Sequence, residues 1–119
     1  MIETLLISYL SEALDVPVYA MEPEIPEESY VLIEKTGSGE KNQILTAMIA
    51  VQSYGKDLLA AATLNEEVKQ AMRAWPAIDD RISACRVNSD YNYSDPKTRR
   101  CRYQAVFDLV YFHEGGTTT

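Results

Sequence analysis

Residues that build metal sites, disulfide frameworks and catalytic centres are scarce in this chain of 119 residues. It contains two cysteines and one histidine. Cys85 and Cys101 have no metal-ligand spacing and are too few for a disulfide framework. His113 lies beside Glu114, with no nucleophile or orienting partner near it in the sequence. We therefore expect a protein that is not an enzyme, with no catalytic residue, no cofactor and no metal site.

A long apolar run and a basic leader are also missing. No stretch reaches the roughly 20 apolar residues that span a bilayer, and the chain opens with Glu3 instead of a basic region. We expect the protein to be soluble and intracellular when it is made. Its length suits a single domain, which we place at residues 1–114, followed by a disordered tail at residues 115–119.

Basic residues are absent from the first third of the chain. Between Met1 and Glu34 there are eight carboxylates and no lysine or arginine, whereas between Arg81 and Arg102 six basic residues face only two acidic ones. The net charge of −7 argues against non-specific binding to nucleic acid or to anionic lipid. Opposite charges at the two ends of a small domain are expected of an assembly subunit with two complementary surfaces.

Two segments have the three- and four-residue apolar spacing of an amphipathic helix. The first covers residues 2–14 and is expected to end before Pro17, because a proline disfavours helical geometry in the preceding residue. The second covers residues 56–75, and Pro76 is expected to stop it. Its buried stripe is predicted to consist of Leu58, Ala61, Ala62, Leu64, Val68, Ala71, Met72 and Trp75. Its water-facing side is predicted to consist of Glu66, Glu67, Lys69, Gln70 and Arg73.

Other segments have the composition of β-strands. They are a short piece at residues 18–21, strands at residues 30–34 and 44–53, and the two arms of a tyrosine-rich hairpin spanning residues 82–113 with a turn near residues 94–97. The strand at residues 44–53 is almost continuously apolar, which indicates cover on both faces by helices or by a neighbouring subunit. The order α-β-β-β-α-β-β predicts an α+β fold, in which a mostly antiparallel sheet of four or five strands has two helices packed on one face.

Alternation along the last strand separates two faces. The predicted core face consists of Cys101, Tyr103, Ala105, Phe107, Leu109 and Tyr111. The other face is polar at its start and apolar at its end, so we expect its far end to be covered as well. A turn centred near Pro96 would place Cys85 opposite Phe107 and Cys101 opposite Tyr91, too far apart for a disulfide. Both cysteines are therefore interpreted as buried or half-buried apolar residues.

Three polar segments match ligand sites only in part. Residues 37–43 lack the spacing of a phosphate-binding loop and are interpreted as a flexible connection. The glutamates of residues 22–28 lack the spacing of a calcium loop, which favours a solvated acidic loop. The arginines of residues 99–102, with their neighbouring tyrosines, would suit single-stranded nucleic acid. Alternation places these tyrosines largely on the core side, however, so a protein partner that carries carboxylates suits the arginines better.

The order of elements resembles that of the tail terminator proteins, also called tail-completion proteins, of long-tailed bacteriophages. The resemblance covers nearly all of residues 1–112, and neck proteins that join head to tail are similar in size and style. It rests on a helix ending in Val16-Pro17-Val18-Tyr19, a proline-bearing loop before Tyr30-Val31-Leu32-Ile33, a strand closing in Val51-Gln52-Ser53-Tyr54-Gly55, a long helix with Leu64 and Val68, and a hairpin with Asp95-Pro96 and Arg102-Tyr103.

The resemblance implies a structural virion protein. It would form a ring, expected to be a hexamer, that caps the phage tail tube, stops its elongation and offers a head–tail joining surface. It would be made in the bacterial host cytoplasm and reside in the virion tail or neck. The implied partners are copies of itself, the tail tube protein and a head-completion or connector protein. DNA would pass through the ring without specific binding, and no membrane is involved.

Two contact surfaces are hypothesised. The acidic loop of one subunit is expected to face the basic strand of the next, through Glu22, Glu24, Glu27, Glu28, Arg99, Arg100 and Arg102. A tail-tube contact loop is expected to consist of Gly37, Ser38, Gly39, Glu40, Lys41, Asn42 and Gln43. The main alternative is a monomeric small-molecule or peptide-binding domain, with an apolar pocket lined by Tyr103, Phe107 and Trp75. An enzyme is a weaker third alternative.

Overall fold

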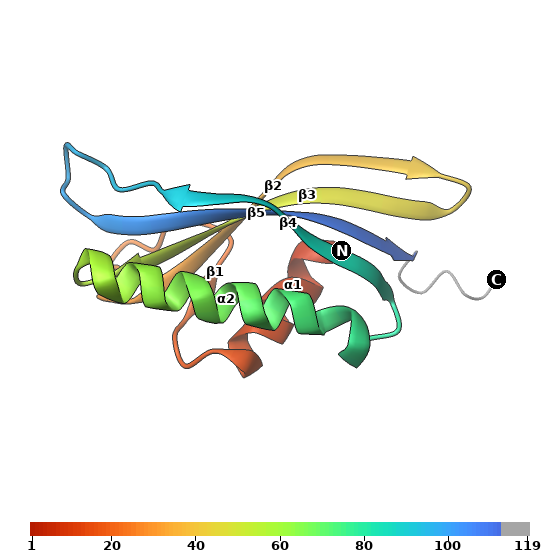
Figure 1. The fold of residues 1–119 in the computed structure, drawn as a ribbon, viewed down its shortest axis with the longest axis horizontal. Helices are drawn as coiled ribbons and strands as arrows, with labels where there is room; N and C mark the ends of the chain where they lie inside the picture. Colours follow the sequence, from red (N-terminus) through yellow and green to blue (C-terminus); the bar gives the residue numbers. More distant parts are fainter. Residues whose placement is uncertain (113–119) are drawn as a thin grey trace.

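The computed structural model describes residues 1–112, which form an α+β fold with two helices and a five-stranded sheet (Figure 1). His113 and the tail expected at residues 115–119 lie outside the described residues. The sheet order is β1-β2-β3-β5-β4, with β1 parallel to β2 and every other pair antiparallel. The predicted fold class and order of elements are confirmed. The sheet is mixed, because β1 is parallel to β2. The elements are α1 (Ile2–Ala13), β1 (Val18–Tyr19), β2 (Tyr30–Lys41), β3 (Ile44–Gly55), α2 (Leu58–Ile78), β4 (Ile82–Asn92) and β5 (Cys101–Phe112).

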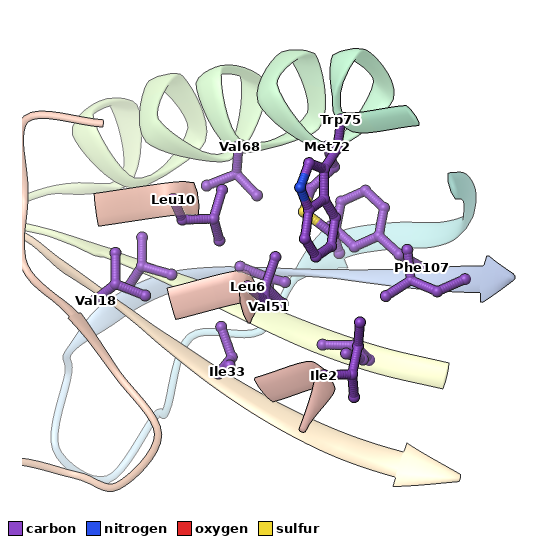
Figure 2. Packing of buried hydrophobic residues seen from close by; sticks show 14 of the residues in the cluster. Ile2, Leu6, Leu10, Val18, Ile33, Val51, Val68, Met72, Trp75 and Phe107 are labelled. Atoms are coloured by element: carbon purple, nitrogen blue, oxygen red, sulfur yellow. The ribbon is translucent and has the colours of Figure 1, made fainter. Parts of the chain in front are cut away.

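Both helices lie on the same face of the sheet, and the core fills the layer between them (Figure 1). Every fourth residue of α1 from Ile2 to Leu10, and Leu14 directly after the helix, is buried, as the spacing predicts. Tyr9 of α1 stacks on Trp75 of α2, with ring centroids 5.2 Å apart. The largest buried side chains from the two helices and the sheet meet in this layer (Figure 2); they include Leu6, Leu10, Ile33, Val51, Val68, Met72, Trp75 and Phe107.

The helix α2 runs past the proline that was expected to stop it. It starts after Asp57, whose side chain accepts a hydrogen bond from the backbone N–H of Ala60 at 2.8 Å. Pro76 lies in the last turn, where its missing N–H removes a single helical hydrogen bond. The backbone N–H of Asp79 still reaches the carbonyl of Trp75 at 2.9 Å. The helix therefore continues to Ile78. Neither described helix is long and apolar enough to cross a membrane.

Two residues of α2 were assigned to the wrong side. Leu58 is 43% exposed because it belongs to the first turn, at the margin of the sheet. Lys69 was expected to face water but is only 9% exposed. Its ammonium group lies 2.7 Å from Glu66 and 3.3 Å from Asp90, a carboxylate that β4 presents toward the helix. The buried stripe of α2 is thus wider than its apolar residues, because a charged partner on β4 allows a lysine within it.

The connection expected at residues 37–43 is not a loop. Residues 37–41 continue β2, paired in register with β3 as far as Lys41 and Ile44, after a bulge between Lys35 and Gly37. The turn needs only Asn42 and Gln43, whose φ angles are 54° and 68°. This is the left-handed geometry that two-residue hairpins require. Glycines and polar residues suggested a flexible loop, whereas here they form a long hairpin arm.

The pairing of β4 with β5 is shifted from the sequence prediction, by two residues at Cys85. Cys85 lies opposite Leu109 rather than Phe107, and Cys101 lies opposite Gly55 of β3. The shift arises because the connection to β5 is longer than the expected four-residue turn, and each of the two bulges in β4 reduces it by one residue. Both cysteines are free and half-buried, consistent with their interpretation as apolar residues.

Candidate functional site

The outer face of the sheet, which no described helix covers, carries a cluster of tyrosines and arginines at one end. Tyr30 of β2 and Tyr54 of β3 are cross-strand partners, and their rings stack with centroids 4.3 Å apart. The guanidinium carbon of Arg100 lies 4.6 Å from the Tyr54 centroid and 5.3 Å from that of Tyr30. A cation at this distance from two ring faces is attracted by both. We call Tyr30, Tyr54, Arg100, Arg102 and Tyr93 the Arg–Tyr cluster.

Glu22 joins the acidic loop to this cluster. The Tyr30 hydroxyl donates a hydrogen bond to the Glu22 carboxylate and accepts one from the Arg100 guanidinium. Arg100 Nη1 also lies 3.4 Å from Glu22 Oε2. Burial, and then the neighbouring Glu22 carboxylate, raise the pKa of Tyr30 above its ordinary value of 10.0. Tyr30 therefore stays a neutral hydroxyl that can donate to Glu22.

Arg102 occupies the other side of the cluster. Its Nη1 donates to the Tyr54 hydroxyl and its Nε to the carbonyl of Tyr93, both at 2.7 Å. Its guanidinium carbon lies 4.5 Å from the Tyr93 ring centroid. Tyr91 reaches the same face, since its hydroxyl accepts a hydrogen bond from the Gln104 amide. The expectation that these tyrosines belong to the core side is therefore wrong for Tyr91 and Tyr93, although half-buried Tyr103 alternates to the helix-covered face.

The cluster explains why β3 is buried on both faces over residues 50–54. The helices cover one side, and tyrosine and arginine side chains of the same chain cover part of the other. Gln52 and Gln104 extend this cover through an amide hydrogen bond of 2.9 Å. The sequence predicted cover on both faces over residues 44–53; this is correct for residues 50–53 and wrong for Ile44, Thr46 and Met48, which are exposed.

The acidic loop and the basic strand lie side by side in one chain, which corrects the prediction of opposite charges at two ends. Besides the contact between Glu22 and Arg100, a hollow of about 260 Å³ is lined by residues of both segments. Its lining includes Pro26, Glu27, Glu28, Arg99 and Arg100. Arg100 and Arg102 are thus engaged within the chain. The contact of these residues with a neighbouring subunit stays a prediction.

The other end of the outer face is apolar and open. Ile44 and Met48 of β3 and Phe112 of β5 are 43%, 40% and 47% exposed. A hollow of about 380 Å³ lies beside them, bordered by Gly37, Met48 and Val110. The far end of β5 was expected to be covered, but among residues 1–112 Phe112 stays exposed and Val110 is only half-buried. The residues expected to contact the tail tube border this region at the end of β2.

A groove on the helix side is the third candidate surface. It has a volume of about 520 Å³, and Leu5, Ser8, Tyr9 and Glu12 of α1 line it. The other wall of the groove consists of Trp75, Ile78, Asp79, Asp80 and Arg81. Asp79 accepts two hydrogen bonds from the Arg81 side chain, at 2.9 and 2.7 Å, and these bonds hold its pKa below the ordinary value against the effect of burial. Sequence analysis did not single out this groove.

The structure gives little support to the alternative of a small-molecule or peptide-binding domain. Phe107, one of three residues proposed to line an apolar pocket, is fully buried in the core, and Trp75 borders the helix-side groove. Among residues 1–112, no three histidine, cysteine or acidic side chains are close enough together to hold a metal ion.

Comparisons with known proteins do not assign the chain to a family. No family model matches it, and no curated protein matches it significantly.

Proposed function

We propose that this chain is a structural virion protein that forms a ring at the end of a bacteriophage tail tube. The ring contains six copies, stops elongation of the tube and forms the surface on which the filled head docks. Its partners are its own copies, the tail tube protein and a head-completion protein. DNA passes through its bore without specific contacts. The chain is made in the bacterial cytoplasm and acts in the tail or neck of the virion.

The observation that carries the proposal is the open apolar end of the outer sheet face. Ile44, Met48 and Phe112 lie there on two neighbouring strands, and the rest of residues 1–112 leaves them exposed. Large exposed apolar side chains gathered on neighbouring strands favour a protein contact. The long hairpin of β2 and β3 carries part of this surface beyond the helices (Figure 1). A projecting arm with an apolar face suits a subunit that must grip a neighbour or a tube.

The fold class supports the same proposal. The resemblance to tail terminators was drawn from the order of elements, and that order is the one in the structure. The Arg–Tyr cluster holds Glu22 of the acidic loop against one end of the outer sheet face, which restrains the side chains there. A rigid face loses less conformational entropy when a partner binds it.

A stop codon placed early in the coding sequence of this chain, within its phage, tests the proposal. Electron microscopy of the lysate is expected to show filled heads separated from tails of irregular length. Supplying the protein from a plasmid should restore joined particles with tails of uniform length. Normal virions in the absence of the chain would contradict the proposal. Joined particles that fail at a later step, such as adsorption, would contradict the assignment to the head–tail junction.

A further inference from the structure

The connection between β4 and β5 presents two basic side chains on a fixed turn. Asp95 organises this turn: its side chain accepts a hydrogen bond from the N–H of Lys97 at 2.9 Å, and its carbonyl accepts one from the N–H of Arg99 at 2.8 Å. Arg99 has a φ of 60°, which turns the chain back toward β5. The side chains of Lys97 and Arg99 are exposed, and within residues 1–112 no ion pair engages them. We call this segment the basic turn.

The helix-side groove offers the opposite charge. Arg81 neutralises Asp79, whereas Glu12 and Asp80 are exposed and make no ion pair with any described residue. The C-terminal end of α2 borders the same groove, and no basic residue lies in its last turn. The free carbonyl groups at a helix C-terminus carry partial negative charge. The groove is therefore bordered by two carboxylates unpaired among residues 1–112, Glu12 and Asp80, and by the negative end of a helix. The basic turn carries two cations that are likewise unpaired in this part of the chain, so the two surfaces have opposite charge.

The two surfaces belong to opposite ends of the molecule. Arg99 lies with Lys56 around the hollow next to the start of α2, whereas the groove lies at the end of that helix. A helix of 21 residues is about 31 Å long, and Figure 1 shows the basic turn and the end of α2 on opposite sides of the fold. A chain cannot place its own turn in its own groove. The match in charge therefore requires a second copy.

We propose that the basic turn of one copy docks in the helix-side groove of the next, with Lys97 and Arg99 paired to Glu12 and Asp80. The guanidinium fork of an arginine suits a carboxylate partner, and the apolar and aromatic residues of the groove suit its aliphatic stem. A contact between two different surfaces links copies head to tail, and it closes into a ring when the rotation per copy allows. This inference rests on the proposed ring and names the contact that builds it.

Charge-exchange variants test the pairing. The turn variant carries Lys97→Glu and Arg99→Glu, and the groove variant carries Glu12→Lys and Asp80→Lys. All four positions are exposed or flank the groove, so both variants should retain the thermal melting of the parent chain. For each variant alone, we expect sedimentation velocity at low salt to give a dissociation constant at least about 30-fold higher than that of the parent chain, because like charges then face each other.

The decisive measurement is the equimolar mixture of the two variants. Each contact in the mixture again joins opposite charges, so assemblies of the parent size should return with an affinity within about threefold of the parent chain. A control variant with Arg73→Glu and Arg86→Glu, two exposed positions outside both surfaces, changes net charge as much as the turn variant does, and it should assemble normally. Variants that assemble like the parent, or a mixture that stays dissociated, would overturn the docking contact.

The outcome separates this inference from the proposed function. Rings that survive all charge changes would leave the ring proposal intact and remove this contact. A parent chain that stays monomeric at concentrations up to about 1 mM would overturn docking between copies. The stop-codon phenotype in the phage would still decide the virion role independently.

Discussion

Glu22 and Arg100 are 78 positions apart in the chain, yet Nη1 of the arginine lies 3.4 Å from Oε2 of the glutamate. The pair joins the acidic loop after β1 to the residue that directly precedes β5. The guanidinium also lies over two stacked tyrosine rings. Charges that looked in sequence like two separate surfaces therefore form one intramolecular contact, and this changes which residues are free to bind a neighbour.

Removing the Arg100 side chain should destabilise the fold. The Arg100→Ala variant loses the contacts with Tyr30 and Tyr54, and its ion pair adds little because both partners are more than a third exposed. We expect the free energy of unfolding in urea to fall by about 1–2 kcal/mol. The Arg99→Ala control should change it by less than about 0.5 kcal/mol. Equal losses in the two variants would show that the Arg–Tyr cluster does not stabilise the fold.

Two glycine substitutions should differ sharply in their effect. A Cβ added at Gly55 would lie 2.5 Å from the backbone nitrogen of Ala61, where α2 begins. Since backbone atoms cannot yield as a flexible side chain does, Gly55→Ala is expected to cost more than about 2 kcal/mol. A Cβ at Gly37 would meet only the Met48 Cβ, at an ordinary 4.0 Å. In thermal unfolding, the melting temperature of Gly37→Ala should be close to that of the parent, and the melting temperature of Gly55→Ala should be far below it.

The tip of the long hairpin offers a stabilising substitution. Gln43 has a φ of 68°, a conformation that favours glycine. Gln43→Gly should therefore raise the free energy of unfolding by about 0.5–1 kcal/mol. The same change at Gln70, on the exposed side of α2, should lower it by about 1 kcal/mol. Destabilisation by Gln43→Gly would be inconsistent with a two-residue turn at this tip.

The thiol of Cys85 should make stability depend on alkaline pH. Burial, with a smaller effect of Asp108, raises its pKa from 9.0 to about 12. The folded state then favours the neutral thiol, and its contribution is complete below pH 9 and is lost as pH rises toward 12. Between pH 8 and pH 10.5 the parent should lose about 1–2 kcal/mol more than Cys85→Ala does. Parallel pH profiles of the two proteins in urea denaturation would exclude this role for the thiol.

The fold was predictable where a local pattern determines it. The four-residue spacing of Leu6 and Leu10 and the apolar run of β3 each specify an element from neighbouring residues alone. Pro76 and the glycines of β2 were misread because contacts with other residues outweigh their local cost: Asp79 still bonds to Trp75 after the proline, and the glycine-bearing end of β2 is paired with β3. A short window of sequence does not contain the contacts with distant residues that decide these cases.

The surfaces were harder to predict, because they depend on which segments become neighbours. Arg100 meets Tyr30 across 70 positions, and the two bulges in β4 set which tyrosines face outward. The helix-side groove joins Glu12 to Asp80 through the packing of α1 against the end of α2. No spacing rule connects residues so far apart, so charge composition suggested complementary surfaces without locating them.

The central claim is that the chain works by joining copies of itself through unlike surfaces into a closed ring. Native mass spectrometry of the full chain, sprayed from concentrated solution at low ionic strength, tests this most directly. We expect one closed assembly of six copies, with no series of longer oligomers. A particle that remains a monomer, or one that stops at a symmetric dimer built from two like surfaces, would contradict it.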